Sequence, residues 1–596
     1  MFKSKPSVIA TAVLLSLGLS ACGGSSNSST PTPTPTPAPT PTNTAPTAVA
    51  LSANEVAEND VAATIGALTA TDADSGETFT YTVDDERFEI SGSDLKLKAD
   101  ISLNYEMVRS VPLKVTVTDS SNNTFVQDLT VNVTDSMGVQ AVLDGLTLPT
   151  TYAFNSKFES ASSVSYSGQS ARQILIAELN TYIGSGLAAD VEADKFAAGT
   201  DVKTALMRMY AATAEQWDED ADDTLTFTTT PAAKQTTLRQ ISSSHKNLQG
   251  KIAGNDETGQ HKDWSTELVG WNAKGSVTPN GVVEALFDQL AENVQTHIDG
   301  SVRNDIAGNP ITKFYINADG TDIKQLVQKF LLGAVNFSQG TDDYLDNTVD
   351  GKGLLSVNTQ DGTKAYSNLE HQFDEGFGYF GAARNYNDYT DLEIRAKSGR
   401  DGWNQGHNDI DADGMIDLKS EINLANSVNA AKRDVGTADN ANSTDFTKQA
   451  FDAFLTGRTI INAAAGESLS DDQMATLLEQ RDTAVLVWEK AISATVVHYI
   501  NDTKADLDKI GTDGYSADDY ADLAKHWSEL KGFSLNLQFN PHSPMTDEQF
   551  ATMQEKIGMK PATVTADVAA YKTQLDEVRT MLQEVYNFDA DNVAGW

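Results

Sequence analysis

Apolar residues between positions 48 and 135 alternate with polar ones. Every second residue from Val111 to Val117 is apolar, and Leu129, Val131 and Val133 repeat the pattern. A period of two places successive side chains on opposite faces of a β-strand. Short turn sequences such as Asp74-Ser75-Gly76 separate these segments. The pattern predicts a small antiparallel β-sandwich over residues 48–135.

The apolar period changes after residue 137 and stays near 3.6 residues to the C-terminus. The clearest case is Thr278-Pro279, a cap and a first-turn proline, which precedes one apolar helical face: Val283, Leu286, Phe287, Leu290, Val294 and Ile298. Further helices are expected over 174–183, 323–335, 474–500 and 564–586. Residues 140–596 are therefore predicted to form a large, mainly α-helical domain, either one large bundle or two fused ones.

The first 47 residues carry a targeting pattern. Lys3 and Lys5 precede a short apolar run, and Leu19-Ser20-Ala21-Cys22 follows it. This arrangement resembles the lipobox of bacterial lipoproteins, which implies a signal peptide over residues 1–21 and a lipid anchor on Cys22. The alternative is an ordinary cleaved signal with an incidental cysteine. Because the apolar run is too short to cross a bilayer, the lipid alone is expected to hold the protein on the membrane.

The segment 22–47 is expected to be a tether. Threonine and proline alternate in it from residue 30 onward, and proline alternation favours an extended chain. Gly23 follows the cysteine where the lipoprotein pattern often has an inner-membrane retention signal, so the resemblance implies the cell envelope and its outer membrane. Cys22 is the only cysteine, so neither a disulfide nor a cysteine metal site is expected.

Acidic residues outnumber basic ones, 84 to 43, and the formal net charge is −41. Such a chain repels polyanions, so nucleic acid is excluded as an expected partner. A solvated acidic coat accounts for most of this charge, and only clustered carboxylates support a cation site.

The β-region contains four short acidic motifs in a fixed order: Glu58-Asn59, Asp72-Ala73-Asp74, Asn104-Tyr105-Glu106 and Val117-Thr118-Asp119. Their order and spacing resemble a single cadherin repeat. The resemblance implies an adhesion module, with a protein or polysaccharide partner, and calcium ligands at two opposite ends of the sandwich: Glu58 and Glu106 at one, Asp72, Asp74 and Asp119 at the other. The alternative is a sandwich with solvated turn aspartates and no tight calcium.

A second calcium candidate follows from the spacing of Asp409-Ile410-Asp411-Ala412-Asp413-Gly414-Met415-Ile416-Asp417. Oxygens at alternate positions converge on one point, and the glycine permits the sharp turn of an EF-hand-like loop. The expected ligands are Asp409, Asp411, Asp413, Met415 through its carbonyl, Asp417 and Glu421. The alternative is an acidic loop without an ion.

Two histidine motifs have helical spacing. His371, Asp374 and Glu375 share one helical face, and His526 and Glu529 share another. Two such helices facing each other in a bundle predict one shared site for iron, zinc or manganese. The alternative is that each histidine has a local structural role.

The helical region resembles an uncharacterised bacterial lipoprotein domain with distant affinity to the imelysin group. The matching segments are Tyr152-Ala153-Phe154, 163–169, 371–381 and 526–533. Imelysin-like proteins carry Gly-x-His-x-x-Glu and are linked to iron uptake, and some were assigned as peptidases. Here Leu369 stands in place of the glycine and Asp374 in place of the glutamate.

Enzyme motifs are missing from the sequence. Gly376 to Gly381 spells G-x-G-x-x-G, but an acidic helical segment precedes it instead of a β-strand. No G-x-S-x-G, H-E-x-x-H or phosphate loop is present. We therefore expect a non-enzymatic, membrane-anchored surface lipoprotein with a calcium-binding cadherin-like adhesion module and a helical ligand-binding domain. The alternative is an imelysin-like protein of iron or other metal acquisition.

Overall fold

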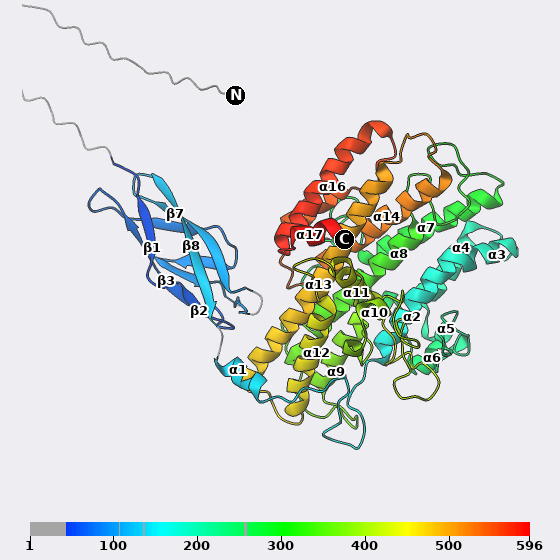
Figure 1. The fold of residues 1–596 in the computed structure, drawn as a ribbon, viewed down its shortest axis with the longest axis horizontal. Helices are drawn as coiled ribbons and strands as arrows, with labels where there is room; N and C mark the ends of the chain where they lie inside the picture. Colours follow the sequence, from blue (N-terminus) through cyan, green and yellow to red (C-terminus); the bar gives the residue numbers. More distant parts are fainter. Residues whose placement is uncertain (1–42, 100, 106–107, 135–136, 256–258) are drawn as a thin grey trace, which may run out of the picture.

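The computed structural model describes residues 43–596 except 100, 106–107, 135–136 and 256–258. The expected signal peptide, Cys22 and nearly all of the tether lie outside the described residues. Figure 1 shows two bodies, an N-terminal β-domain and a larger helical body. Both parts of the predicted fold class are therefore confirmed.

The β-domain consists of two four-stranded sheets. One has the strand order β1-β3-β6-β5, with β1 at Ala48–Leu51, β3 at Thr64–Thr71, β6 at Asp94–Leu97 and β5 at Phe88–Ser91. The other has the order β2-β8-β7-β4, with β2 at Glu55–Ala57, β8 at Thr124–Thr134, β7 at Ser110–Thr118 and β4 at Thr80–Val83.

Alternation along β7 fixes which face of the second sheet is buried. Val111, Leu113, Val115 and Val117 all point into the sandwich core, and the intervening residues are exposed or half-buried. Most neighbouring strands are antiparallel, as expected, but β2 pairs with β8 in parallel, with Val56 opposite Val133. The three-residue β2 is therefore an edge strand that runs parallel to its neighbour β8, whereas the two strands of a hairpin run antiparallel.

The helical body is arranged around α13 (Asp471–Leu507), which is 37 residues long. It packs against α12 (Phe446–Ala463), α14 (Ala517–Ser534), α11 (Ala425–Thr437) and α16 (Thr565–Val585) (Figure 1). The other α-helices are α1 (Met137–Asp144), α2 (Ser167–Thr181), α3 (Leu187–Glu192), α4 (Gly199–Ala211), α5 (Ala214–Glu219), α6 (Leu238–Ile241), α7 (Pro279–Ile298), α8 (Ile323–Leu331), α9 (Asn368–Phe380), α10 (Asp391–Ile394), α15 (Asp547–Ile557) and α17 (Ala590–Gly595). Short π-helical and 3-10 segments join several of them: η1 (Tyr182–Gly186), η2 (Gln249–Lys251), η3 (Leu332–Phe337), η4 (Gly340–Tyr344), η5 (Gly353–Leu355), η6 (Tyr386–Asp388) and η7 (Leu535–Gln538).

The predicted helices are confirmed. Thr278 caps α7 by accepting a hydrogen bond from the Gly281 amide, and Pro279 occupies the first turn. One continuous apolar core runs from Tyr152 to Trp596 and includes residues of nearly every long helix. The helical region is therefore one large body and not two fused bundles.

The helix expected over 323–335 changes its winding part of the way along. It is an α-helix to Leu331 and a π-helix from Leu332. Gly333 lies there against Asn536, and a Cβ atom on it would be 2.0 Å from the Asn536 Oδ1. The wide π turn therefore brings the backbone against η7, a contact that apolar periodicity does not encode.

Among the residues that the structure describes, no helix is long and apolar enough to cross a membrane.

Candidate functional site

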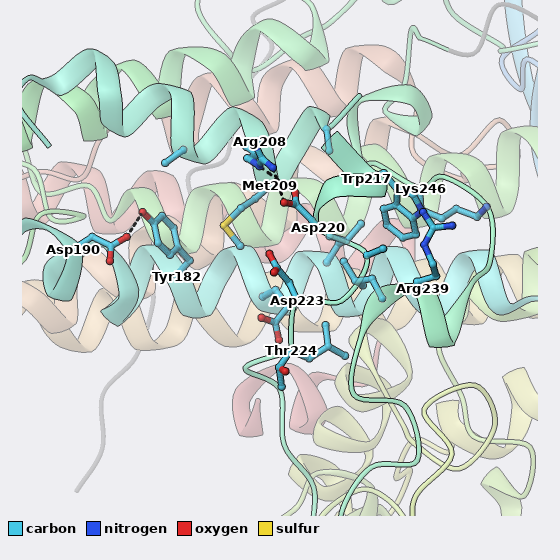
Figure 2. Close-up of a pocket in the computed structure, with 17 residues that line it drawn as sticks. Tyr182, Asp190, Arg208, Met209, Trp217, Asp220, Asp223, Thr224, Arg239 and Lys246 are labelled. Atoms are coloured by element: carbon cyan, nitrogen blue, oxygen red, sulfur yellow. Dashed lines mark hydrogen bonds and ion pairs between the residues drawn. The ribbon is translucent and has the colours of Figure 1, made fainter. Parts of the chain in front are cut away.

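A cavity of about 480 Å³ lies among α2, α4, α5 and α6 of the helical body. Ligand sites in proteins are typically clefts of about 300–1,000 Å³. Figure 2 shows side chains from these helices and from the loop after α5 pointing into it. Sequence periodicity had not singled out this site, because α5 and α6 are only six and four residues long.

Part of the cavity wall is apolar. Leu175 of α2, Met209 of α4, Leu225 and Leu238 supply this part. Trp217 of α5 also lines the cavity and is only 5% exposed. The helix that carries it starts with a reciprocal capping box between Thr213 and Gln216, which holds this short helix in place.

Most charged groups of the cavity wall are already paired. Arg208 donates to both carboxylate oxygens of Asp220, at 3.1 and 2.6 Å. Glu178 accepts three hydrogen bonds from Thr226 and Phe227. The Tyr182 hydroxyl donates to Asp190 at 3.0 Å, and burial together with this carboxylate raises the pKa of the tyrosine.

Three polar groups of the wall have no partner among the described residues. The indole Nε1 of Trp217 and the Nε of Arg239 are buried N–H donors without an acceptor. The carboxylate of Asp223 is exposed and forms no side-chain hydrogen bond or ion pair in this part of the chain. Buried polar groups are nearly always hydrogen-bonded, so these two donors lack the partner that such groups usually have.

The expected calcium loop has the predicted turn. Asp409, Asp411 and Asp413 lie with carboxylate oxygens within 4.8 Å of one another, and within the described ranges they form the only such group of histidine, cysteine and acidic side chains. The Asp409 carboxylate accepts hydrogen bonds from the amides of Asp413 and Gly414, at 3.1 and 2.8 Å. Ile416 is fully buried and anchors the loop in the body.

The remaining expected ligands of this loop have other partners. Glu421 accepts hydrogen bonds from the backbone amides of Ile410 and Asp417, so its carboxylate connects the two ends of the loop. Asp417 accepts from Gln235 at 2.9 Å, and the Met415 amide donates to Asp413. The ammonium of Lys234 lies 2.6 Å from Asp413 and 3.9 Å from Asp411.

The cadherin-like carboxylates fall into two groups at opposite ends of the sandwich. Asp72, Asp74 and Asp119 lie where the chain enters, and Asp74 accepts hydrogen bonds from the amide and hydroxyl of Thr44, at 2.7 and 2.8 Å. Glu58 lies at the other end and accepts from the Tyr105 amide at 3.0 Å. Glu106 lies outside the described residues.

At the end that carries Glu58, the β-domain contacts the helical body. The side-chain amide of Asn59 donates to Glu479 of α13 at 2.7 Å. Glu58 therefore lies beside a domain junction, where no second β-repeat follows in the described chain.

The two histidine motifs do not form a shared site. His371 of α9 has its Nδ1 3.0 Å from the Ser165 carbonyl, and Glu375 accepts from Gln169 at 2.7 Å. His526 of α14 has its Nδ1 2.7 Å from Asp506, and Glu529 lies 3.4 Å from the Lys329 ammonium. The two sets have separate partners, and α9 and α14 lie apart in the body (Figure 1). The prediction of one shared metal site is wrong, because the two sets lie on separate helices and contact different residues.

Asp374 has a structural role in this arrangement. It pairs with Arg458 of α12 at 2.7 Å, and the same guanidinium pairs with Glu370 at 2.7 Å. All three side chains are fully buried, and the Tyr152 hydroxyl also donates to Asp374 at 2.9 Å. Burial raises the pKa of Asp374 even though Arg458 opposes this shift.

Sequence reasoning missed the nearest neighbours of His526. Asp502 and Asp506 lie on α13 one and two turns after His498. The Oδ2 of Asp502 is 3.4 Å from the Nε2 of His498 and 3.9 Å from the Nε2 of His526. Burial and the nearby Arg433 lower the pKa of His498 to about 3, so this imidazole is neutral. The spacing of four residues in His498-x-x-x-Asp502-x-x-x-Asp506 indicates that these three side chains share one face of a helix, and it was visible in the sequence.

By its fold, this protein is a two-domain protein with a small N-terminal β-sandwich and a large helical body that encloses a ligand-sized cavity. Residues 149–561 match the family model described as "Domain of unknown function (DUF4856)", so the chain belongs to that family.

No curated protein matches the chain. A solved structure described as "PcdhgB3 EC1-4 in 50 mM HEPES" is similar at 17% sequence identity, over 15% of this chain and 24% of that one. Its TM-score is 0.13, which carries no argument about fold or function.

Proposed function

We propose that this protein is a lipid-anchored ligand-binding protein of the cell envelope, whose helical body holds a small molecule in the cavity among α2, α4, α5 and α6. The observation that carries the proposal is the pair of buried, unpartnered donors of Trp217 and Arg239 in a cavity of about 480 Å³. An unsatisfied buried donor costs about 1–3 kcal/mol, and a ligand acceptor removes that cost.

A thermal-shift screen of small polar molecules on the purified chain tests the proposal. A ligand of the cavity raises the melting temperature, because it binds the folded state alone. Ala205 lines the cavity from α4, so Ala205→Trp fills it and is expected to abolish every such shift. Shifts of equal size in this variant would contradict binding in the cavity.

We further propose that calcium binds the loop of Asp409, Asp411 and Asp413, and that the β-domain acts as an adhesion module toward a protein or polysaccharide. Three carboxylates within 4.8 Å of one another support the calcium site, since calcium prefers several oxygen ligands. The resemblance to a cadherin repeat supports the adhesive role. Retention of wild-type protein on purified cell-surface polysaccharide, with and without calcium, tests it.

Metal acquisition is a second candidate function. It is supported by the two imidazoles that flank Asp502 between α13 and α14, since histidine and carboxylate groups suit iron and zinc. Elemental analysis of the purified chain, compared with the His498→Ala variant, tests this candidate. Equal iron and zinc contents in the two proteins would contradict it.

A further inference from the structure

The proposed ligand cavity has chemically different ends. Figure 2 shows Trp217 and Arg239 at one end, the pair of Tyr182 and Asp190 at the other, and Asp223 between them. The first end offers N–H donors, the second offers the Asp190 carboxylate, and the Asp223 carboxylate lies between them. The arrangement of these groups specifies what kind of ligand fits.

The donor end suits an anionic group. Trp217 Nε1 and Arg239 Nε are both buried and both lack an acceptor in the described chain, and the guanidinium carbon lies 5.7 Å from the Trp217 ring. The terminal nitrogens of Arg239 already donate to Asp218 and to the Ser243 carbonyl, which leaves the Nε–H for a ligand. A carboxylate oxygen accepts such hydrogen bonds more strongly than a neutral group does.

The acidic side of the cavity suits an amine. The exposed carboxylate of Asp223 forms no side-chain hydrogen bond or ion pair with another described residue. Asp190 accepts one hydrogen bond on each oxygen, from Tyr182 at 3.0 Å and from Lys195 at 2.7 Å, and each oxygen retains a free lone pair. An ammonium group placed here would be attracted by two carboxylates, whereas a second anionic group would be repelled.

Leu175, Met209, Leu225 and Leu238 add apolar surface to the cavity, beside the paired charges of Arg208 and Asp220. A sugar would leave its hydroxyl groups against these side chains without hydrogen-bond partners, and unpartnered polar groups are costly to bury. Aliphatic side chains of a ligand would instead gain from burial there.

We infer that the cavity binds a short peptide with free ends, its carboxylate on Trp217 and Arg239, its ammonium on Asp223 and Asp190, and its side chains against the apolar walls. This inference rests on the proposed ligand-binding function and specifies the class of ligand.

Four matched probes test the inference by calorimetry on the full chain: alanyl-leucine, its N-acetyl form, its C-terminal amide and the doubly blocked form. The free dipeptide is expected to bind most tightly. Each single block is expected to weaken binding roughly tenfold or more, because each removes one charged hydrogen-bonding group. Equal affinity for all four probes would overturn the inference and leave the ligand-binding function intact.

Two substitutions assign the ends separately. Trp217→Phe keeps an aromatic ring but removes the N–H, so it should weaken binding of the free and N-acetyl forms and leave the amide unaffected. Asp223→Asn should weaken binding of the free and amide forms and leave the N-acetyl form unaffected. Asp222→Asn is the control, since Asp222 is an exposed neighbour that does not line the cavity.

The outcomes separate this inference from the function on which it rests. If alanyl-leucine fails to bind but another small molecule stabilises the wild type and not Ala205→Trp, the peptide class is wrong and the ligand-binding function stands. If no small molecule distinguishes these two proteins, both are wrong.

Discussion

Arg458 lies at the centre of the helical body, with its guanidinium between Glu370 and Asp374 and no exposed surface on any of the three side chains. Removing one member of a buried ion pair leaves an uncompensated charge and costs about 3–5 kcal/mol. We expect Arg458→Met to lower the free energy of unfolding by about that amount, as measured by urea denaturation.

The matched control for this substitution is Lys448→Met. Lys448 lies on the same helix and pairs with Asp452, and the two side chains are 60% and 41% exposed. Exposed pairs contribute little, about 0–1 kcal/mol. If both variants lose the same free energy, the buried network does not stabilise the body as described.

Lys531 of α14 is a buried cation that gives stability a pH dependence. Its ammonium donates to Gln554 at 2.8 Å, and desolvation lowers its pKa from 10.5 to about 7. The unfolded chain keeps the higher value and therefore binds more protons between pH 7 and pH 10. By linkage, this lysine makes the free energy of unfolding increase as pH rises through that window.

We expect Lys531→Met to reduce the slope of melting temperature against pH between 7 and 10. Lys448→Met is the control, since Lys448 lies on the surface with a side chain that is 60% exposed. A wild-type slope that persists in Lys531→Met would show that other groups cause the pH dependence.

The loop of residues 409–417 is the element on which the calcium proposal can be tested. Asp409, Asp411 and Asp413 supply most of the charge that offsets dehydration of a divalent ion. We expect calcium to raise the melting temperature of the wild type, and the gain to shrink when all three become asparagine. An undiminished calcium response in the triple variant would move the site elsewhere, with the β-domain carboxylates next to be tested.

Helices and strands were predictable because each long element repeats its apolar positions with one period, as α7 and β7 do. The local turn at 409–417 was also predictable, because its residues are neighbours in sequence. The cavity was not, since it joins short elements from residues 175 to 246. The shared histidine site failed for a related reason. Helical spacing shows which residues share a face, but not that Arg458, more than 80 positions away, pairs with Asp374.

At the scale of the whole molecule, the β-domain and the helical body have separate apolar cores with no residue in common. We expect a fragment of residues 137–596 to unfold cooperatively, with a melting temperature within about 2 °C of that of the same body in the full chain. The Asn59–Glu479 hydrogen bond that it loses is worth about 1 kcal/mol. Aggregation of the fragment, or the loss of its cooperative transition, would show that the two cores depend on each other.

Membrane attachment through Cys22 is testable by one substitution. The chain has no other cysteine, and its described helices include none that could span a bilayer. We expect Cys22→Ala to leave the protein soluble or still attached to an uncleaved signal, as followed by fatty-acid labelling and detergent partition. Normal lipid labelling of this variant would refute the proposed anchor.

Lys234 competes with the proposed calcium ion for the carboxylates of the acidic loop. Its ammonium lies 2.6 Å from Asp413 and is held nearby by the backbone bridge between Ala233 and Ile416. A tethered group of this kind acts at an effective concentration in the millimolar range or above. A divalent ion therefore has to displace the Lys234 ammonium from Asp413, so half-saturation of the site requires a higher concentration of free calcium. If calcium binds the loop as proposed, the affinity is therefore expected to lie in the range of weak, millimolar calcium modules and not at trace concentrations.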